Sequence, residues 1–166
     1  MADQARELAA FLPVERGRSW DPPTDVAGSP TFDEIWLEVG PLVQQSTIVA
    51  HNASFDMGVL RGTLASCRIQ HPLFQYFCSV SLAKRIWPHM PKFDLKTLCT
   101  RNGIPLVHHR AGNDAEATAH LVIRAGEQLG SASIEDLLVR ARLNMGVFYP
   151  GGHRTPGGMV TAAVGY

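Results

Sequence analysis

Residues 47–56 read Thr-Ile-Val-Ala-His-Asn-Ala-Ser-Phe-Asp. The run Thr47–Ala50 is apolar or β-branched and does not alternate with polar residues, which predicts a short strand buried on both faces. The polar turn His51-Asn52 follows, and then Leu60 and Leu64 recur at helical spacing. In α/β proteins, active sites commonly lie outside the carboxyl ends of such strands. We therefore expect functional side chains at this turn.

The rest of the chain predicts helices and one further strand. Thr31 and Glu34 fit a capping box that opens a helix ending near Gly40-Pro41. From Asn144 onward glycine and proline dominate, which predicts a loose tail. The other expected elements are a strand over Tyr76–Val80, a helix through Leu82–Trp87, a helix from the Asp94 cap to Gly103, a helix over Asn113–Leu129 and a last helix opened by Ser133. This order is α/β in character, although two short strands are too few for a stable sheet.

Bulk properties narrow the function. The chain of 166 residues has room for one domain, and its 45% apolar content is ordinary for a globular protein. The formal net charge of zero argues against a passive DNA-coating protein, but not against an enzyme that holds a strand end through metal ions. Three cysteines without paired spacing indicate reduced thiols. With no signal-peptide segment and no long apolar run, the sequence predicts a cytoplasmic protein that does not use a membrane.

Two polar clusters contain candidate catalytic residues. Asp56 lies at the start of the helix that follows the strand, and Asp114 opens a long helix five residues after His109. The spacing between His109 and Asp114 allows the imidazole to lie close to a metal ion that the carboxylate binds. Either acid is also suited to stabilise a helix N-terminus through the macrodipole, with the histidine simply at the surface. A zinc site is less favoured, because no third or fourth ligand stands at a useful spacing.

Taken together, the clusters resemble the second and third motifs of the DEDDh 3′–5′ exonucleases: HNASFD at 51–56 and HHRAGNDAEA at 108–117. This family includes the epsilon subunit of bacterial DNA polymerase III and ribonuclease T. The resemblance extends to DVAGSPTFDEIW and FDLKTLCTRNGIPL, which precede the two motifs, and covers residues 26–129. It implies a ribonuclease H-like exonuclease fold.

The resemblance also implies the chemistry. Family members remove nucleotides from single-stranded 3′ ends of DNA or RNA with two Mg²⁺ or Mn²⁺ ions about 4 Å apart, and a DNA polymerase is an implied partner. Carried over by motif, Asp56 and Asp114 are metal ligands. His109 is the general base, preferred over the neighbouring histidine because it stands five residues before the aspartate. Asn52 and Phe55 are implied to shape the pocket for the terminal nucleotide.

The sequence departs from the family at its first motif, Asp-x-Glu on the first strand, which supplies two further carboxylates. No acid before residue 30 lies in an apolar run with that spacing. We therefore expect a fold that is incomplete at its N-terminus, where the first strands of the central sheet are absent, together with weak metal binding and little or no hydrolysis. One expected cause is a shifted reading frame around Trp20, since codons available to Ser19-Trp20-Asp21 encode His-Gly-Ile one base later.

Two functions stay open at this point. The first is an exonuclease whose sequence is truncated or misread at its start. The second is a catalytically inactive exonuclease-like module that binds nucleic acid or a protein partner. The expected organisation comprises an atypical segment at 1–25, an exonuclease-like domain at 26–130, a C-terminal helix at 131–143 and a Gly/Pro-rich tail at 144–166.

Overall fold

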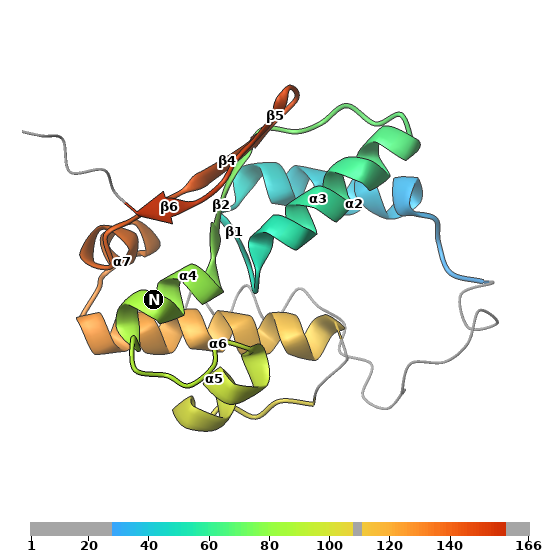
Figure 1. The fold of residues 1–166 in the computed structure, drawn as a ribbon. Coiled ribbons are helices and arrows are strands. Elements are labelled where there is room, and N and C mark those ends of the chain that lie inside the picture. The colour runs from blue at the N-terminus through green and yellow to red at the C-terminus, as the bar shows by residue number, and fades with distance from the viewer. Residues whose placement is uncertain (1–27, 108–110, 159–166) are drawn as a thin grey trace, which may run out of the picture.

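A four-stranded sheet forms the centre of the computed structural model, which describes residues 28–107 and 111–158 (Figure 1). Its strands, in spatial order, are β1 (Ile48–Ala50), β2 (Phe74–Cys78), β4 (Gly146–Tyr149) and β5 (Gly152–Arg154). β1 runs parallel to β2, whereas β4 is antiparallel to both β2 and β5. A separate two-stranded ladder joins β3 (Leu143–Asn144) to β6 (Gly157–Gly158).

Helices cover both faces of the sheet, which confirms the expected α/β character (Figure 1). One face packs against α2 (Phe32–Gln45) and α3 (Ala53–Ser66), and the other packs against α4 (Ser79–Ile86), α6 (Ala111–Leu129) and α7 (Ile134–Arg140), with α5 (Leu95–Asn102) packed on α6. Adjacent residues of β2 point to opposite faces, so Tyr76 joins the first core and Phe77 joins the second. None of the helices among the described residues is long and apolar enough to cross a bilayer.

The capping residues expected from the sequence begin and end helices as predicted. The Glu34 carboxylate accepts a hydrogen bond from the Thr31 backbone N–H at 2.7 Å, which forms the capping box of α2. The Asp94 carboxylate accepts from the backbone N–H of Thr97 at 2.9 Å and so caps α5. α5 ends at Gly103, whose φ of 64° lies in the left-handed region that glycine adopts without strain.

The predicted end of α2 at Gly40-Pro41 is wrong, because the helix continues to Gln45. Proline has no backbone N–H and therefore costs the helix one hydrogen bond. Trp36 before the proline and Val43 after it both pack against the same core cluster. This tertiary packing holds both halves in one helix, a contribution that local signals do not contain.

The loose tail predicted from Asn144 onward is also wrong for the residues described, since β4, β5 and β6 lie there. Phe148 of β4 is fully buried and stacks on Phe74 of β2 with ring centroids 4.9 Å apart. Gly146 allows the closest approach, because a Cβ at this position would lie 2.7 Å from the Tyr76 ring. Glycine in this segment therefore permits tight strand pairing. The segment adds β4 and β5 to a sheet for which the sequence predicted only two strands.

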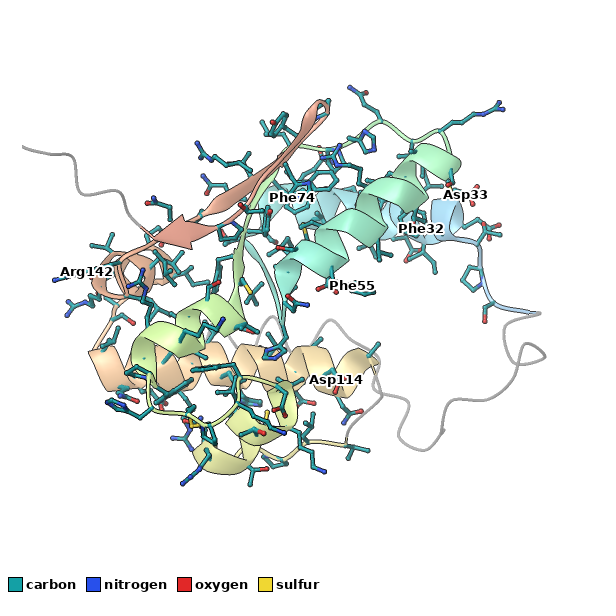
Figure 2. All side chains as sticks on the ribbon, viewed as in Figure 1. Phe32, Asp33, Phe55, Phe74, Asp114 and Arg142 are labelled. Atoms are coloured by element: carbon teal, nitrogen blue, oxygen red, sulfur yellow. The ribbon has the colours of Figure 1, made fainter. Side chains whose placement is uncertain are left out.

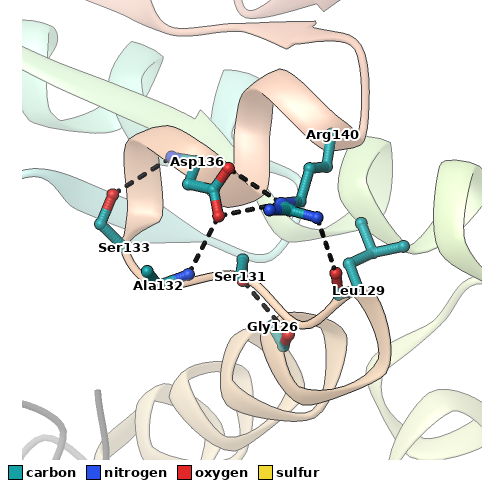
Figure 3. Close-up of polar contacts among 7 residues, drawn as sticks. All are labelled: Gly126, Leu129, Ser131, Ala132, Ser133, Asp136 and Arg140. Carbon is teal, nitrogen blue, oxygen red and sulfur yellow. Dashed lines mark hydrogen bonds and ion pairs between the residues drawn. The ribbon is translucent and has the colours of Figure 1, made fainter.

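The α6–α7 connection fixes α7 against the second core through a local polar cluster (Figure 3). Arg140 Nε donates to both carboxylate oxygens of Asp136, at 2.8 and 2.9 Å, and Arg140 Nη1 donates to the carbonyl of Leu129 at 3.3 Å. The Ser133 hydroxyl accepts from the Asp136 N–H at 3.1 Å, as expected for the predicted cap. The pair between Arg140 and Asp136 spans one helical turn at the surface, so its own contribution to stability is small.

Candidate active site

The parallel pair β1 and β2 brings two polar turns to the same edge of the sheet. Ala50 and Cys78 are opposite each other in the register, so His51 and Ser79, which follow them, meet there. Nδ1 of His51 lies 2.9 Å from the hydroxyl of Ser79, which is 2% exposed. Asn52 makes the turn into α3 with a φ of 70°, a left-handed conformation that asparagine tolerates better than most residues.

Two carboxylates from different helices approach this edge. Asp56 lies in the first turn of α3, next to Phe55, and Asp114 lies in the first turn of α6 (Figure 2). Both carboxylates, together with that of Asp94, act electrostatically on the His51 imidazole. Residues far apart in the sequence therefore gather around one side chain at the end of β1.

Burial sets the protonation of His51. Its pKa lies below the ordinary histidine value because burial of the imidazole disfavours the charged form. A hydrogen bond to the backbone of Phe93 acts in the opposite direction, as do the negative charges of Asp94, Asp56 and Asp114. His51 is therefore a mainly neutral, hydrogen-bonded residue near neutral pH, suited to holding the turn in place rather than to carrying charge.

The carboxylates themselves sit in a partly desolvated environment. Asp56 is exposed as a whole residue, but its carboxyl is partly desolvated by neighbouring atoms, which raises its pKa. The charge of His51 lowers this pKa to a smaller degree. Asp114 is half-buried at the start of α6. Burial, and to a smaller degree the charge of Asp114, raises the pKa of Cys99 to about 11, so this thiol is an inert core residue. A carboxyl such as Asp56, whose pKa is raised by desolvation at the end of a strand, is a candidate functional group.

The predicted site residues divide into two groups. Asp56, Asp114, Asn52 and Phe55 all lie at or beside the end of β1, and the Phe55 side chain is 69% exposed there. His109 lies outside the described residues. His120, on the same helix as Asp114, is exposed, with Nε2 3.9 Å from a Glu116 carboxylate oxygen.

The sequence patterns assign no role to His51, Ser79 or Asp94 at this site. Asp94 was predicted only as a helix cap, which it is. The available signal is positional for His51, which directly follows the strand predicted over Thr47–Ala50, and parallel strands end at the same edge. Ser79 lies inside the strand predicted over Tyr76–Val80, but the observed strand ends two residues earlier, at Cys78.

The residues present offer a limited fit to a metal ion. Among the described residues, no group of three or more His, Cys, Asp or Glu side chains is arranged to hold one. Two carboxylates, Asp56 and Asp114, do converge on the same edge. Mg²⁺ retains several waters and is often bound through one or two protein carboxylates plus a substrate phosphate, and this donor set fits that mode of binding.

Comparisons with known proteins agree on one family. The model of the exonuclease family named for RNase T matches residues 22–122. The chain is 34% identical over 118 residues to a DNA polymerase III PolC-type protein of Halalkalibacterium halodurans, covering 70% of this chain and 8% of that protein. It is also 33% identical over 101 residues to the 3′-5′ exonuclease DinG of Staphylococcus epidermidis, covering 60% of this chain and 11% of that protein. No solved structure matches the chain.

Proposed function

Because the chain belongs to the exonuclease family of RNase T, we propose that the end of β1 is a nuclease site that removes nucleotides from single-stranded 3′ ends of DNA or RNA. The described part has a mixed α/β fold consistent with a partial ribonuclease H-like exonuclease fold. One observation supports the site above all. Asp56 and Asp114, from two helices, both act on the His51 imidazole at the carboxyl edge of the sheet.

In this proposal each residue has a separate task. Asp56 and Asp114 hold a divalent cation, Mg²⁺ or Mn²⁺, together with the substrate phosphate. Bound cations of this kind, two of them in the intact family site, supply charge stabilisation at the phosphate and lower the pKa of the attacking water. His109 accepts the proton from that water. The exposed ring of Phe55 stacks on the terminal base, and Asn52 fixes the turn that presents it.

Two carboxylates are few for this chemistry, so we expect at most slow hydrolysis by this chain. Divalent cations close together repel each other strongly unless several carboxylates neutralise them. The lack of a ready-made group of three ligands among the described residues also favours the second candidate function, a catalytically inactive module that binds nucleic acid.

A DNA polymerase is the partner we propose, in the cytoplasm. PolC-type DNA polymerase III proteins are among the relatives, and this chain spans only 8% of the length of the one from Halalkalibacterium halodurans. An assay of 3′-end shortening, performed with and without the polymerase, tests whether the site acts within such a larger protein or alone.

The site is tested with 5′-labelled single-stranded DNA and RNA in the presence of Mg²⁺ or Mn²⁺. Wild-type chain should shorten the 3′ end slowly, and Asp56→Asn or Asp114→Asn should abolish the shortening, because each removes a cation ligand. Glu116→Gln is the matched control, since it removes a partly exposed carboxylate from the same helix as Asp114 and should keep the activity.

Binding of Mn²⁺, followed by electron paramagnetic resonance, provides a second readout that does not need turnover. It should weaken in both asparagine variants and persist in Glu116→Gln. Near-normal shortening in either asparagine variant would refute the site assignment. A wild-type chain that binds the oligonucleotide but never shortens it would support the inactive module instead.

A further inference from the structure

We propose that the surface of α4 and α5 binds the sugar–phosphate backbone of the single strand whose 3′ end reaches the end of β1. This rests on the proposed function, because it assigns a nucleic acid to that site. We define the cationic surface by five residues of α4, α5 and their connection: Lys84, Arg85, Lys92, Lys96 and Arg101.

The zero net charge of the chain conceals this surface. Residues 79–103 carry those five cations and a single acid, Asp94, which leaves a local charge of +4. Asp94 is also the only acidic residue anywhere between Asp56 and Asp114. The compensating negative charges lie in other parts of the chain, so a polyanion approaching α4 and α5 meets a positive field.

These cations are available to a ligand. All five side chains are exposed, and none forms an ion pair with a described residue. Asp94, the one nearby acid, accepts hydrogen bonds from the Thr97 backbone N–H at 2.9 Å and the Thr97 hydroxyl at 2.8 Å. Its carboxylate is therefore engaged in the helix cap, although it also lies near Lys92.

Rings are interleaved with the cations, which favours nucleic acid over an acidic protein. Nζ of Lys84 lies 5.7 Å from the centroid of the Phe93 ring. Arg101 lines a shallow pocket of about 410 Å³ together with Trp87, His89 and Met90. Aromatic faces that stack bases beside cations that contact phosphates are the usual combination in proteins that bind single strands without sequence preference.

The surface also continues directly from the candidate site. The Phe93 backbone and the Asp94 carboxylate, both at the start of α5, act on the His51 imidazole. The connection between α4 and α5 therefore lies beside His51, on which Asp56 and Asp114 also act. A strand with its 3′ end at Asp56 and Asp114 can leave over this connection onto α4 and α5.

The test compares two triple variants that remove equal charge. Lys92→Gln/Lys96→Gln/Arg101→Gln alters the cationic surface, and Arg68→Gln/Arg142→Gln/Arg154→Gln removes three exposed arginines from other parts of the fold. Anisotropy of a 5′-labelled 15-residue oligothymidine is measured with the full chain in EDTA between 50 and 200 mM KCl. Unchanged circular dichroism checks the fold of each variant.

Each phosphate neutralised on a single strand contributes about −0.7 to the slope of log K against log salt. The surface variant should therefore lose about 2 units of slope, which corresponds to about a 100-fold loss of affinity at 0.1 M salt. The control triple should bind like the wild type. An unchanged slope in the surface variant, an equal loss in the control triple, or no binding by the wild type would overturn the proposal. Displacement of the oligonucleotide by polyglutamate at equal charge would also overturn it and indicate an acidic protein partner.

A parallel hydrolysis assay separates this proposal from the proposed function. If the surface variant loses binding while the wild type never shortens a 3′ end, the surface stands and the nuclease proposal fails. If the wild type shortens 3′ ends and the surface variant does so with unchanged KM, the nuclease stands and the surface proposal fails.

Discussion

Replacing Phe148 by alanine tests whether the Gly/Pro-rich C-terminal segment holds the sheet that carries the candidate site. The Phe148 ring is fully buried in β4, between the neighbouring strand and α3. It stacks on Phe74 at 4.9 Å, and the Arg61 guanidinium of α3 lies over it, 4.3 Å from its centroid. Arg61 Nη2 also donates to the carbonyls of Tyr149 and Gly152, so α3 and the β4–β5 hairpin are joined through this ring.

The size of the loss follows from these contacts. A buried phenylalanine replaced by alanine costs about 3–5 kcal/mol of unfolding free energy. The lost ring stacking and the uncovered guanidinium place the expected value in the upper half of that range. With an m value of about 2 kcal/mol per molar, the urea midpoint should fall by about 2 M. Tryptophan fluorescence reports the transition, since Trp36 packs on the same core cluster.

Tyr149→Ala is the control, because it removes the next ring of the same strand, which is 41% exposed. Its cost should stay near or below about 1 kcal/mol. A Phe148→Ala midpoint as close to wild type as that of Tyr149→Ala would show that β4 contributes no core packing. The reasoning that joins this segment to the sheet would then be wrong.

Three further predictions concern individual residues. Because burial lowers the pKa of folded His51, the unfolded chain takes up the proton first as the pH falls. The contribution of His51 to the free energy of unfolding should therefore be complete above about pH 6.5 and should decrease as the pH falls toward the folded pKa. An NMR titration midpoint for His51 at or above 6.5 would contradict this. Gly146→Ala should destabilise the fold by about 1–3 kcal/mol, because its Cβ would lie 2.7 Å from the Tyr76 ring and from a backbone carbonyl; a melting temperature equal to wild type would exclude that clash. His109→Ala should slow 3′-end shortening by ~10²–10⁴-fold while Mn²⁺ binding persists, whereas His108→Ala should have little effect; the reverse order of the two rates would assign the base to His108.

The sequence by itself determined the local features of the fold. Thr31, Asp94 and Ser133 begin helices as predicted, because each hydrogen bond involved joins residues at most three apart. The strand at 48–50 and the turn into α3 were likewise predictable from a short apolar run followed by polar residues. The motifs around Asp56 and Asp114 predicted the family, which the match over residues 22–122 confirms.

Only the tertiary structure decided which distant residues meet. β4 pairs with β2, although the two strands are far apart in the sequence. Nothing local in the Gly/Pro-rich segment distinguishes a loose tail from a strand that packs Phe148 into the core. α2 passes Pro41 because Val43, beyond the proline, is partly buried against the first core. His51 contacts Ser79 and feels the charges of Asp56, Asp94 and Asp114 because parallel strands end at one edge, where separate helices begin. Burial and strand pairing depend on residues from distant parts of the chain. The free energy that they contribute outweighs the local helix and strand propensities of any short segment.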